Sequence, residues 1–216
     1  MDKPLQPPRR QRERLRRRQE ILDAALRVFA IRGYDGTTMA EISRTAEYPL
    51  ATIYKVFPSK EEIYLELVHS YVRQLEERLV AAVKLSDRSP LERLESCARI
   101  KAEFFQQNKD SLKVFLAEHG QIELAMLSGT RATEEPWQAL EQTYQRMTGL
   151  YADLFAEGIA NGDFKPLPPR DLGVLYLAMT NAMAWQWLVA DTEQRNLGDQ
   201  MQHVLTILSG GICRHE

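Results

Sequence analysis

The sequence predicts an all-α chain with two domains, a three-helix N-terminal domain that contains a helix-turn-helix and a larger helical body. Three observations predict this class. Apolar residues recur at spacings of three and four through most of the chain, as on a buried helix face. No segment shows the alternating pattern of a strand. Between Gly33 and Lys60, two short helical patterns flank a tight break, which is typical of a helix-turn-helix. We place the domains at residues 1–58 and 59–216.

The first short helix is predicted from Met39 to about Ala46. Thr38 precedes it, and its hydroxyl can accept a hydrogen bond from a free backbone N–H at the helix start. Glu41 lies three residues further on, and the pair forms a capping box. Ile42 and Ala46 then share the buried face.

The second short helix follows the break at residues 47–49. Proline is tolerated in the first helical turn, so this helix should run from Pro49 or Leu50 to about Val56. Ile53 and Phe57 should face inward. The next helix starts after Ser59, which can act as its N-cap.

Charge is distributed unevenly along the chain. The whole chain has 28 Lys and Arg against 30 Asp and Glu, whereas residues 1–60 have 13 against 7, which leaves 15 against 23 for the rest. A basic end on an acidic body indicates nucleic-acid binding at that end, although a solvated basic tail would look the same. Seven of the ten residues from Arg9 to Arg18 are arginine, and such a run neutralises phosphates or enters a minor groove.

Several other protein classes are disfavoured. The two cysteines, Cys97 and Cys213, suggest no disulfide framework, so we expect a cytoplasmic protein. No run of 18 apolar residues occurs, and we expect neither a membrane-spanning helix nor a secretory signal. No phosphate loop, nucleophile elbow or zinc-ligand spacing is present, so we expect no enzyme activity and no cofactor.

The remaining elements follow from periodicity and breakers. We expect disorder over residues 1–9 and a bracing helix whose apolar pattern runs from Leu15 to Gly33. The body should contain long helices over residues 59–85, 90–108, 136–161, 170–190 and 197–213, and a short one over 111–118. We expect a weak helix over 121–127 and a loop over 128–135.

One spacing suggests a metal site. Glu66 and His69 form a Glu-x-x-His pair, which di-iron helical bundles use twice, but a second pair is missing. We therefore predict no metal ligands. The alternatives that remain open are a helical-bundle metalloprotein or enzyme, and a DNA-binding protein without a small-molecule effector.

The helix-turn-helix stretch resembles the DNA-binding domain of the tetracycline-repressor (TetR) family of bacterial transcription regulators. The resemblance covers about residues 18–67. The family usually has Gly-Val-Ser in the turn, whereas this chain has Glu47, Tyr48 and Pro49, so we expect a slightly remodelled turn. The matching residues are Ile21, Leu22, Ala24, Ala25, Phe29, Gly33, Thr37, Thr38, Ile42, Ala46, Thr52, Tyr54, Phe57, Ser59, Lys60 and Glu61.

The resemblance implies a homodimeric, ligand-responsive transcription regulator, with repression as the expected effect, acting on a palindromic double-stranded DNA operator. The second short helix would lie in the major groove. The residues expected to contact phosphates are Thr37, Thr38, Tyr54 and Lys60. The residues expected to face base edges are Tyr48, Pro49, Leu50, Ala51, Thr52 and Lys55. Leu50 could instead pack within the turn.

The resemblance also implies a dimer formed by the last two helices and a small-molecule cavity inside the body. The expected dimer residues are Met179, Ala182, Val189, Met201, Val204, Leu205 and Leu208, unless these stripes complete the monomer core. The effector is expected to be apolar or aromatic. The expected cavity residues are Phe104, Phe115, His119, Met126, Tyr151, Phe155, Met183 and Trp187, and ordinary core packing is the alternative for each.

Overall fold

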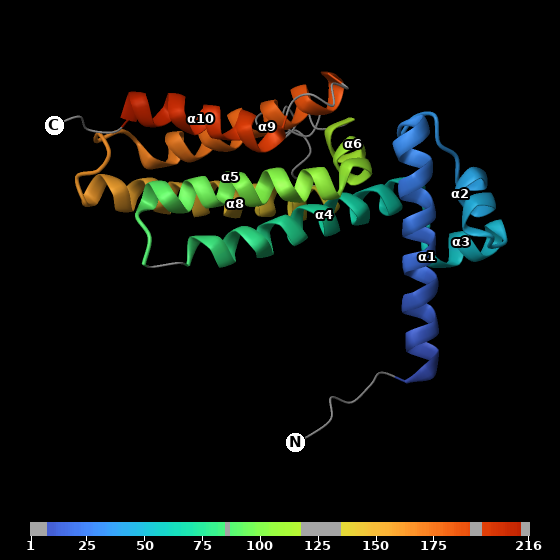
Figure 1. Cartoon of the computed structure of the whole chain (residues 1–216). Helices are drawn as coiled ribbons and strands as arrows, with labels where there is room; N and C mark the ends of the chain where they lie inside the picture. The colour runs from blue at the N-terminus through green and yellow to red at the C-terminus, as the bar shows by residue number, and fades with distance from the viewer. Residues whose placement is uncertain (1–7, 85–86, 118–134, 191–195, 213–216) are drawn as a thin grey trace.

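The computed structural model is an elongated bundle of helices with a smaller three-helix unit at one end (Figure 1). It describes residues 8–84, 87–117, 135–190 and 196–212. All regular elements in these ranges are helices, which confirms the predicted all-α class. The expected disorder at the N-terminus, the weak helix over 121–127 and the loop over 128–135 lie largely or wholly outside the described residues, as do His119 and Met126.

The N-terminal unit consists of α1 (Arg9–Arg32), α2 (Met39–Ala46) and α3 (Leu50–Val56). Figure 1 shows α1 crossing the end of the body, with α2 and α3 packed beside it. Ile21, Ile42, Ile53 and Phe57 are fully buried and form the centre of this unit. The short helices cannot be stable alone, so α1 provides the apolar surface on which they fold.

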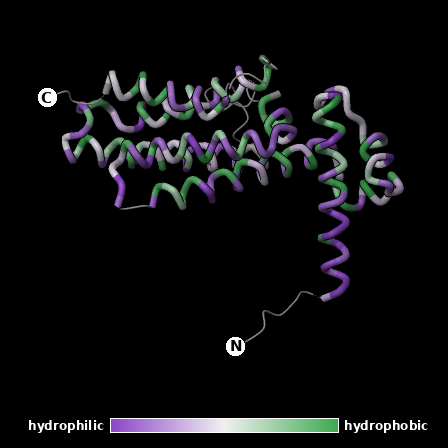
Figure 2. Tube along the Cα trace, in the orientation of Figure 1, coloured by the Kyte–Doolittle hydropathy of each residue, from purple (hydrophilic) through white to green (hydrophobic). Residues whose placement is uncertain are grey.

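α1 begins earlier than its apolar pattern suggested. The arginine run forms its first turns, which project beyond the packed core and are strongly hydrophilic (Figure 2). The apolar pattern, which begins only at Leu15, predicted no helix over Arg9–Arg14, whereas the structure has one there. Arginine is a good helix former, and the i,i+4 ion pairs of Arg9 with Glu13 and Arg16 with Glu20 add support.

The body contains α4 (Lys60–Val83), α5 (Pro90–Gln107), α6 (Lys109–Ala117), α8 (Glu135–Ala160), α9 (Pro169–Ala190) and α10 (Leu197–Ile212). Ser59 caps α4 as expected, and Ser89 caps α5. α6 starts two residues before the predicted position, because the Asn108 carbonyl already accepts the Leu112 N–H at 2.9 Å. α8 and α9 pack closely at Gly173, where a Cβ would lie 2.8 Å from the Thr148 carbonyl oxygen.

α9 is more apolar than one buried face requires. It is long and apolar enough to cross a membrane by length and composition alone, with a mean hydropathy of 1.2 over its best window, one third of which is buried. Because no uninterrupted apolar run exists, the sequence pattern had not indicated such a helix. One face, including Leu172, Tyr176 and Leu177, packs into the body, whereas Leu175 and Val189 remain exposed.

The orientation of α10 corrects part of the predicted dimer surface. Met201, Val204 and Leu205 are at most 3% exposed within the single chain, so they complete the monomer core. Leu208 is half-buried, and Ile207 is 68% exposed. On α9, Met179 is half-buried, whereas Ala182 and Val189 are exposed. Apolar spacing identified the stripe on α10 but could not show whether the same chain or a second copy covers it.

This difference in burial predicts that substitutions at two neighbouring positions of α10 change the stability by very different amounts. Leu205→Ala should lower the free energy of unfolding by about 2–5 kcal/mol, because it leaves a cavity in the core. Ile207→Ala should change the free energy of unfolding by under about 1 kcal/mol when the protein is dilute enough to be monomeric. Chemical denaturation followed by circular dichroism measures both. Equal losses at the two positions would contradict the observed orientation of α10.

Candidate nucleic-acid interface

Local capping positions α2 and α3. The Thr38 hydroxyl accepts the Glu41 N–H at 3.3 Å, and the Glu41 carboxylate accepts the Thr38 N–H at 2.9 Å, so the predicted capping box is present. The hydrogen bonds that this carboxylate accepts from the Thr38 N–H and hydroxyl lower the pKa of Glu41. Arg32 forms an ion pair with the same carboxylate at 2.7 Å, which ties the end of α1 to the start of α2.

α3 presents an apolar outer face. Ile53 is buried, while Leu50 is 39% exposed and Tyr54 is 49% exposed. Pro49, Ala51 and Lys55 are exposed as well, and Thr52 is half-buried. The side chains of α3 that are expected to contact DNA therefore lie on its accessible side, and only Thr52 among them is partly covered. Apolar contacts with thymine methyl groups suit such a surface.

The turn between α2 and α3 is held by Glu47 and Tyr48. Glu47 adopts the left-handed conformation (φ 57°), which favours glycine. The Ser43 hydroxyl donates to the Tyr48 carbonyl at 2.6 Å, and the Tyr48 hydroxyl donates to the Glu20 carboxylate of α1. This last bond lowers the pKa of the Glu20 carboxyl and raises that of the Tyr48 phenol. The remodelled turn is thereby attached to α1.

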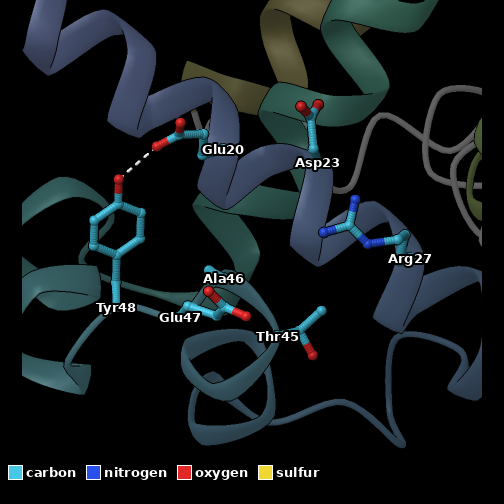
Figure 3. Close-up of a pocket in the computed structure, with 7 residues that line it drawn as sticks. All are labelled: Glu20, Asp23, Arg27, Thr45, Ala46, Glu47 and Tyr48. Atoms are coloured by element: carbon cyan, nitrogen blue, oxygen red, sulfur yellow. Dashed lines mark hydrogen bonds between the residues drawn. The ribbon is translucent and has the colours of Figure 1, made fainter.

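A hollow of about 540 Å³ lies between α1 and this turn (Figure 3). Glu20, Asp23 and Glu47 line it with three carboxylates, and Arg27 provides the one basic side chain of its wall. This hollow is unsuited to a phosphate because its charge has the wrong sign. The Tyr48 ring, predicted to face bases, is half-buried here and held by Glu20, so in this structure it positions the turn.

The predicted phosphate ligands differ in their availability. The Thr37 side chain is buried, and its hydroxyl donates to the Gly33 carbonyl at 2.7 Å, so it cannot reach a phosphate in this conformation. Thr38 is exposed but serves as the helix cap. The Lys60 ammonium donates to the Tyr34 carbonyl at 2.6 Å and lies 4.1 Å from the Tyr34 ring centroid. Because an ammonium has three donors, Lys60 can still bind an anion.

One member of the arginine run has a structural role that the sequence pattern did not indicate. Arg18 donates to both carboxylate oxygens of Glu66 on α4 and to the Val56 carbonyl at the end of α3. Its guanidinium lies 4.1 Å from the Phe57 ring centroid. Arg18 therefore joins α1, α3 and α4. Glu66, half of the possible metal pair, is occupied by this contact, and within the described ranges no three His, Cys, Asp or Glu side chains gather as metal ligands.

The predicted cavity residues fall into two groups. Phe104, Tyr151 and Phe155 are fully buried, whereas Phe115, Met183 and Trp187 are half-buried. The Tyr71 ring of α4 packs against Phe104 (5.0 Å between centroids) and Phe115 (5.6 Å), so α4, α5 and α6 share one aromatic cluster.

Sequence reasoning missed a polar group beside this cluster. Lys101 of α5 is 0% exposed, and its ammonium donates to Thr180 Oγ1 and Asn181 Oδ1 of α9, both at 2.7 Å. Burial lowers the pKa of Lys101 to about 7. The signal was present in the sequence, because position 101 continues the apolar stripe of Leu94 and Ala98 at helical spacing.

The left-handed turn residue predicts a stability difference. Glu47→Gly should unfold with a free energy about 1 kcal/mol higher than Glu47→Ala, because only glycine adopts this φ without a steric penalty. Both variants remove the carboxylate, so the comparison isolates the backbone contribution. Thermal unfolding of the two proteins measures it. An alanine variant at least as stable as the glycine variant would be inconsistent with a strained turn.

Comparisons with known proteins agree with this geometry. Residues 21–67 match the family described as "Bacterial regulatory proteins, tetR family". The HTH-type transcriptional repressor KstR2 of Mycobacterium tuberculosis is 26% identical over 92% of this chain and 94% of its own length. The solved structure of the ketosteroid transcriptional regulator KstR2 superposes with a TM-score of 0.70 at 23% identity, covering 92% of this chain and 96% of that one.

Two further solved structures share the fold. FadR of Bacillus subtilis, in complex with stearoyl-CoA, has a TM-score of 0.70 at 21% identity and covers 89% of this chain and 98% of its own. AibR, in complex with isovaleryl coenzyme A and operator DNA, has a TM-score of 0.67 at 18% identity, and the match covers 88% of this chain and 97% of AibR. The helix-turn-helix over residues 21–67 is that of the tetR family of bacterial regulatory proteins, and the chain is a DNA-binding transcriptional regulator.

Proposed function

We propose that the protein is a homodimeric, ligand-responsive repressor that works in the cytoplasm. α3 enters the major groove of a palindromic operator, and the helical body binds a small apolar or aromatic effector that releases the DNA. Residues 1–58 form the DNA-binding domain, and residues 59–216 form the effector and dimerisation domain. The exposed face of α3 beside a helical arginine run is the observation that carries this proposal. The names of KstR2 as a repressor and of AibR with operator DNA support it.

Affinity for DNA should come mainly from phosphates. The outer face of α3 has few hydrogen-bond donors, so Leu50, Ala51 and Thr52 provide apolar contacts, and Tyr54 and Lys55 provide polar ones. Arg10 and Arg14 are exposed one turn apart on the projecting part of α1, where they can bind the DNA backbone. Backbone contacts of this kind are independent of sequence and sensitive to salt.

Dimerisation is assigned to the exposed stripe of α9 with help from α10. Leu175, Ala182, Trp185 and Val189 recur at helical spacing on its outer side, and Ile207 of α10 is exposed too. Contiguous apolar surface of this kind marks a protein interface. A symmetric pair then presents two copies of α3 about one duplex turn apart, which matches a palindromic operator.

One prediction from this proposal separates phosphate contacts from base contacts. With an operator selected from random DNA, the Arg10→Gln/Arg14→Gln variant should weaken binding to all sequences and reduce the slope of log affinity against log salt by up to about 2. Lys55→Ala should instead change the preferred sequence. Fluorescence anisotropy over a salt series measures both, with Lys113→Ala on α6 as a control. A salt slope that the double arginine variant leaves unchanged would exclude the arginine helix as a DNA contact.

The second prediction concerns the dimer. Leu175→Glu/Val189→Glu should give a folded monomer whose operator affinity falls at least about tenfold, because charges would be buried in the interface. Gln106→Glu adds a charge to the exposed side of α5 and should remain dimeric. Sedimentation velocity and operator binding report the two effects. If the double variant remains a dimer with full affinity, α9 is not the interface.

A further inference from the structure

The interior of the body contains a lysine without a balancing charge. Lys101 is fully buried between α5 and α9, and its two hydrogen bonds go to neutral oxygens of Thr180 and Asn181. Within the described residues, no carboxylate pairs with it. Lysine is almost never fully buried unless it is paired, because removing its charge from water is costly. Near pH 7 such a lysine is only partly protonated, and an anion that pairs with it would hold it in the charged form.

The titratable groups around Lys101 cannot provide that anion. Cys97 lies one turn before it on α5, and burial raises the pKa of its thiol to about 12. Burial also raises the pKa of Tyr151 on α8 and of Tyr176 on α9 well above the ordinary value of 10. On the α4 side, burial raises the pKa of Tyr71 as well. All four groups are neutral near pH 7, so none offsets a charge on the ammonium.

Two tyrosines in the rings packed around this part of the body carry unpaired hydroxyls. The Tyr151 and Tyr71 hydroxyls are buried and have no hydrogen-bond partner among the described residues. Tyr151 packs on Tyr176 (4.6 Å between centroids), whose carbonyl accepts the Thr180 hydroxyl. Phe105 has both Lys101 and Tyr71 as neighbours: Lys101 Nζ is 5.6 Å from its ring centroid, and the Tyr71 ring stacks on it with the centroids 6.2 Å apart.

Unpaired buried donors are uncommon and costly, so they indicate a missing acceptor. Here the donors accompany a lysine that is itself without an anion, and the surroundings are aromatic. A ligand with acceptor oxygens at one end and an apolar remainder would pair with the ammonium and pack against the neighbouring rings. Attraction between opposite charges is strong in such a poorly solvated site.

We propose that the effector is a small monocarboxylic acid, whose carboxylate binds Lys101 between α5 and α9 and whose apolar part packs against the ring cluster of Phe104 and Phe105. This inference rests on the proposed ligand-responsive function and names the chemical class of the effector. The carboxylate replaces Thr180 and Asn181 as partner of the ammonium. Tyr71 belongs to α4, the helix that leads to the DNA-binding unit, so an acid beside it changes contacts on which regulation can act.

The test uses octanoate and 4-phenylbutyrate against their primary amides, titrated into the full chain by calorimetry. Each acid should bind at least tenfold more tightly than its amide at pH 6.5. Binding keeps Lys101 protonated, so affinity for the acids should be constant below pH 7 and fall about tenfold per pH unit above it. The amides should show no such dependence. The acids should also release the protein from a selected operator.

Lys101→Gln provides the matched variant, because it retains a donor for Thr180 and Asn181 but cannot carry a charge. It should bind operator as the wild type does, bind acids no better than amides, and lose the pH dependence. Lys113→Gln removes an exposed lysine of α6 and should behave as wild type. If Lys101→Gln does not fold, the comparison of acids with amides across pH in the wild type decides by itself.

Three results would overturn the inference: equal binding of acids and amides, full acid affinity in a folded Lys101→Gln variant, or no binding of either acid by a protein that binds its operator. In each case the assignment as a DNA-binding repressor would stand. The proposed function would fail in a different way: selection from random DNA would then yield no sequence that the protein binds.

Discussion

The position of α3 relative to the body is held by contacts of Arg18. This side chain of α1 binds the Glu66 carboxylate of α4, the last carbonyl of α3 and the face of the Phe57 ring. A guanidinium is planar and rigid, so these contacts fix the three helices at one mutual angle. The ion pair is about one third exposed, and such pairs contribute little free energy. Its importance is geometric.

A second contact joins the two units from the side of the body. The Tyr64 hydroxyl of α4 donates to the Val114 carbonyl of α6 at 3.2 Å. The Tyr64 ring also packs against Phe29 and Tyr34 of the DNA-binding unit, and Lys60 lies over Tyr34. Aromatic rings in a dense core cannot move independently, so a shift of α6 or α4 would also displace Phe29 and Tyr34. These contacts link α4 and α6 of the body to Phe29 of α1 and to Tyr34, which follows α1.

α9 combines two tasks that have opposite requirements. Its inner face completes the core and supplies the oxygens that hold Lys101, whereas its outer face is apolar and uncovered in the single chain. The first task requires polar groups in the interior, and the second requires apolar groups at the surface. Together they give the helix a hydropathy high enough for a membrane span. In the proposed dimer, a second copy of the chain covers this surface.

The sequence by itself determined what depends on neighbours along the chain. The caps at Thr38 and Ser59, the break between the two short helices and the helical class all follow from local hydrogen bonds and periodicity. Only the tertiary structure decided the roles that depend on distant partners. Periodicity places Leu205 on an apolar stripe but does not say that the same chain covers it. Composition reveals neither that Arg18 binds Glu66, 48 residues away, nor that Lys101 meets Thr180 across the core. Burial and pairing are properties of the packed molecule, because they are set by which surfaces exclude water from each other.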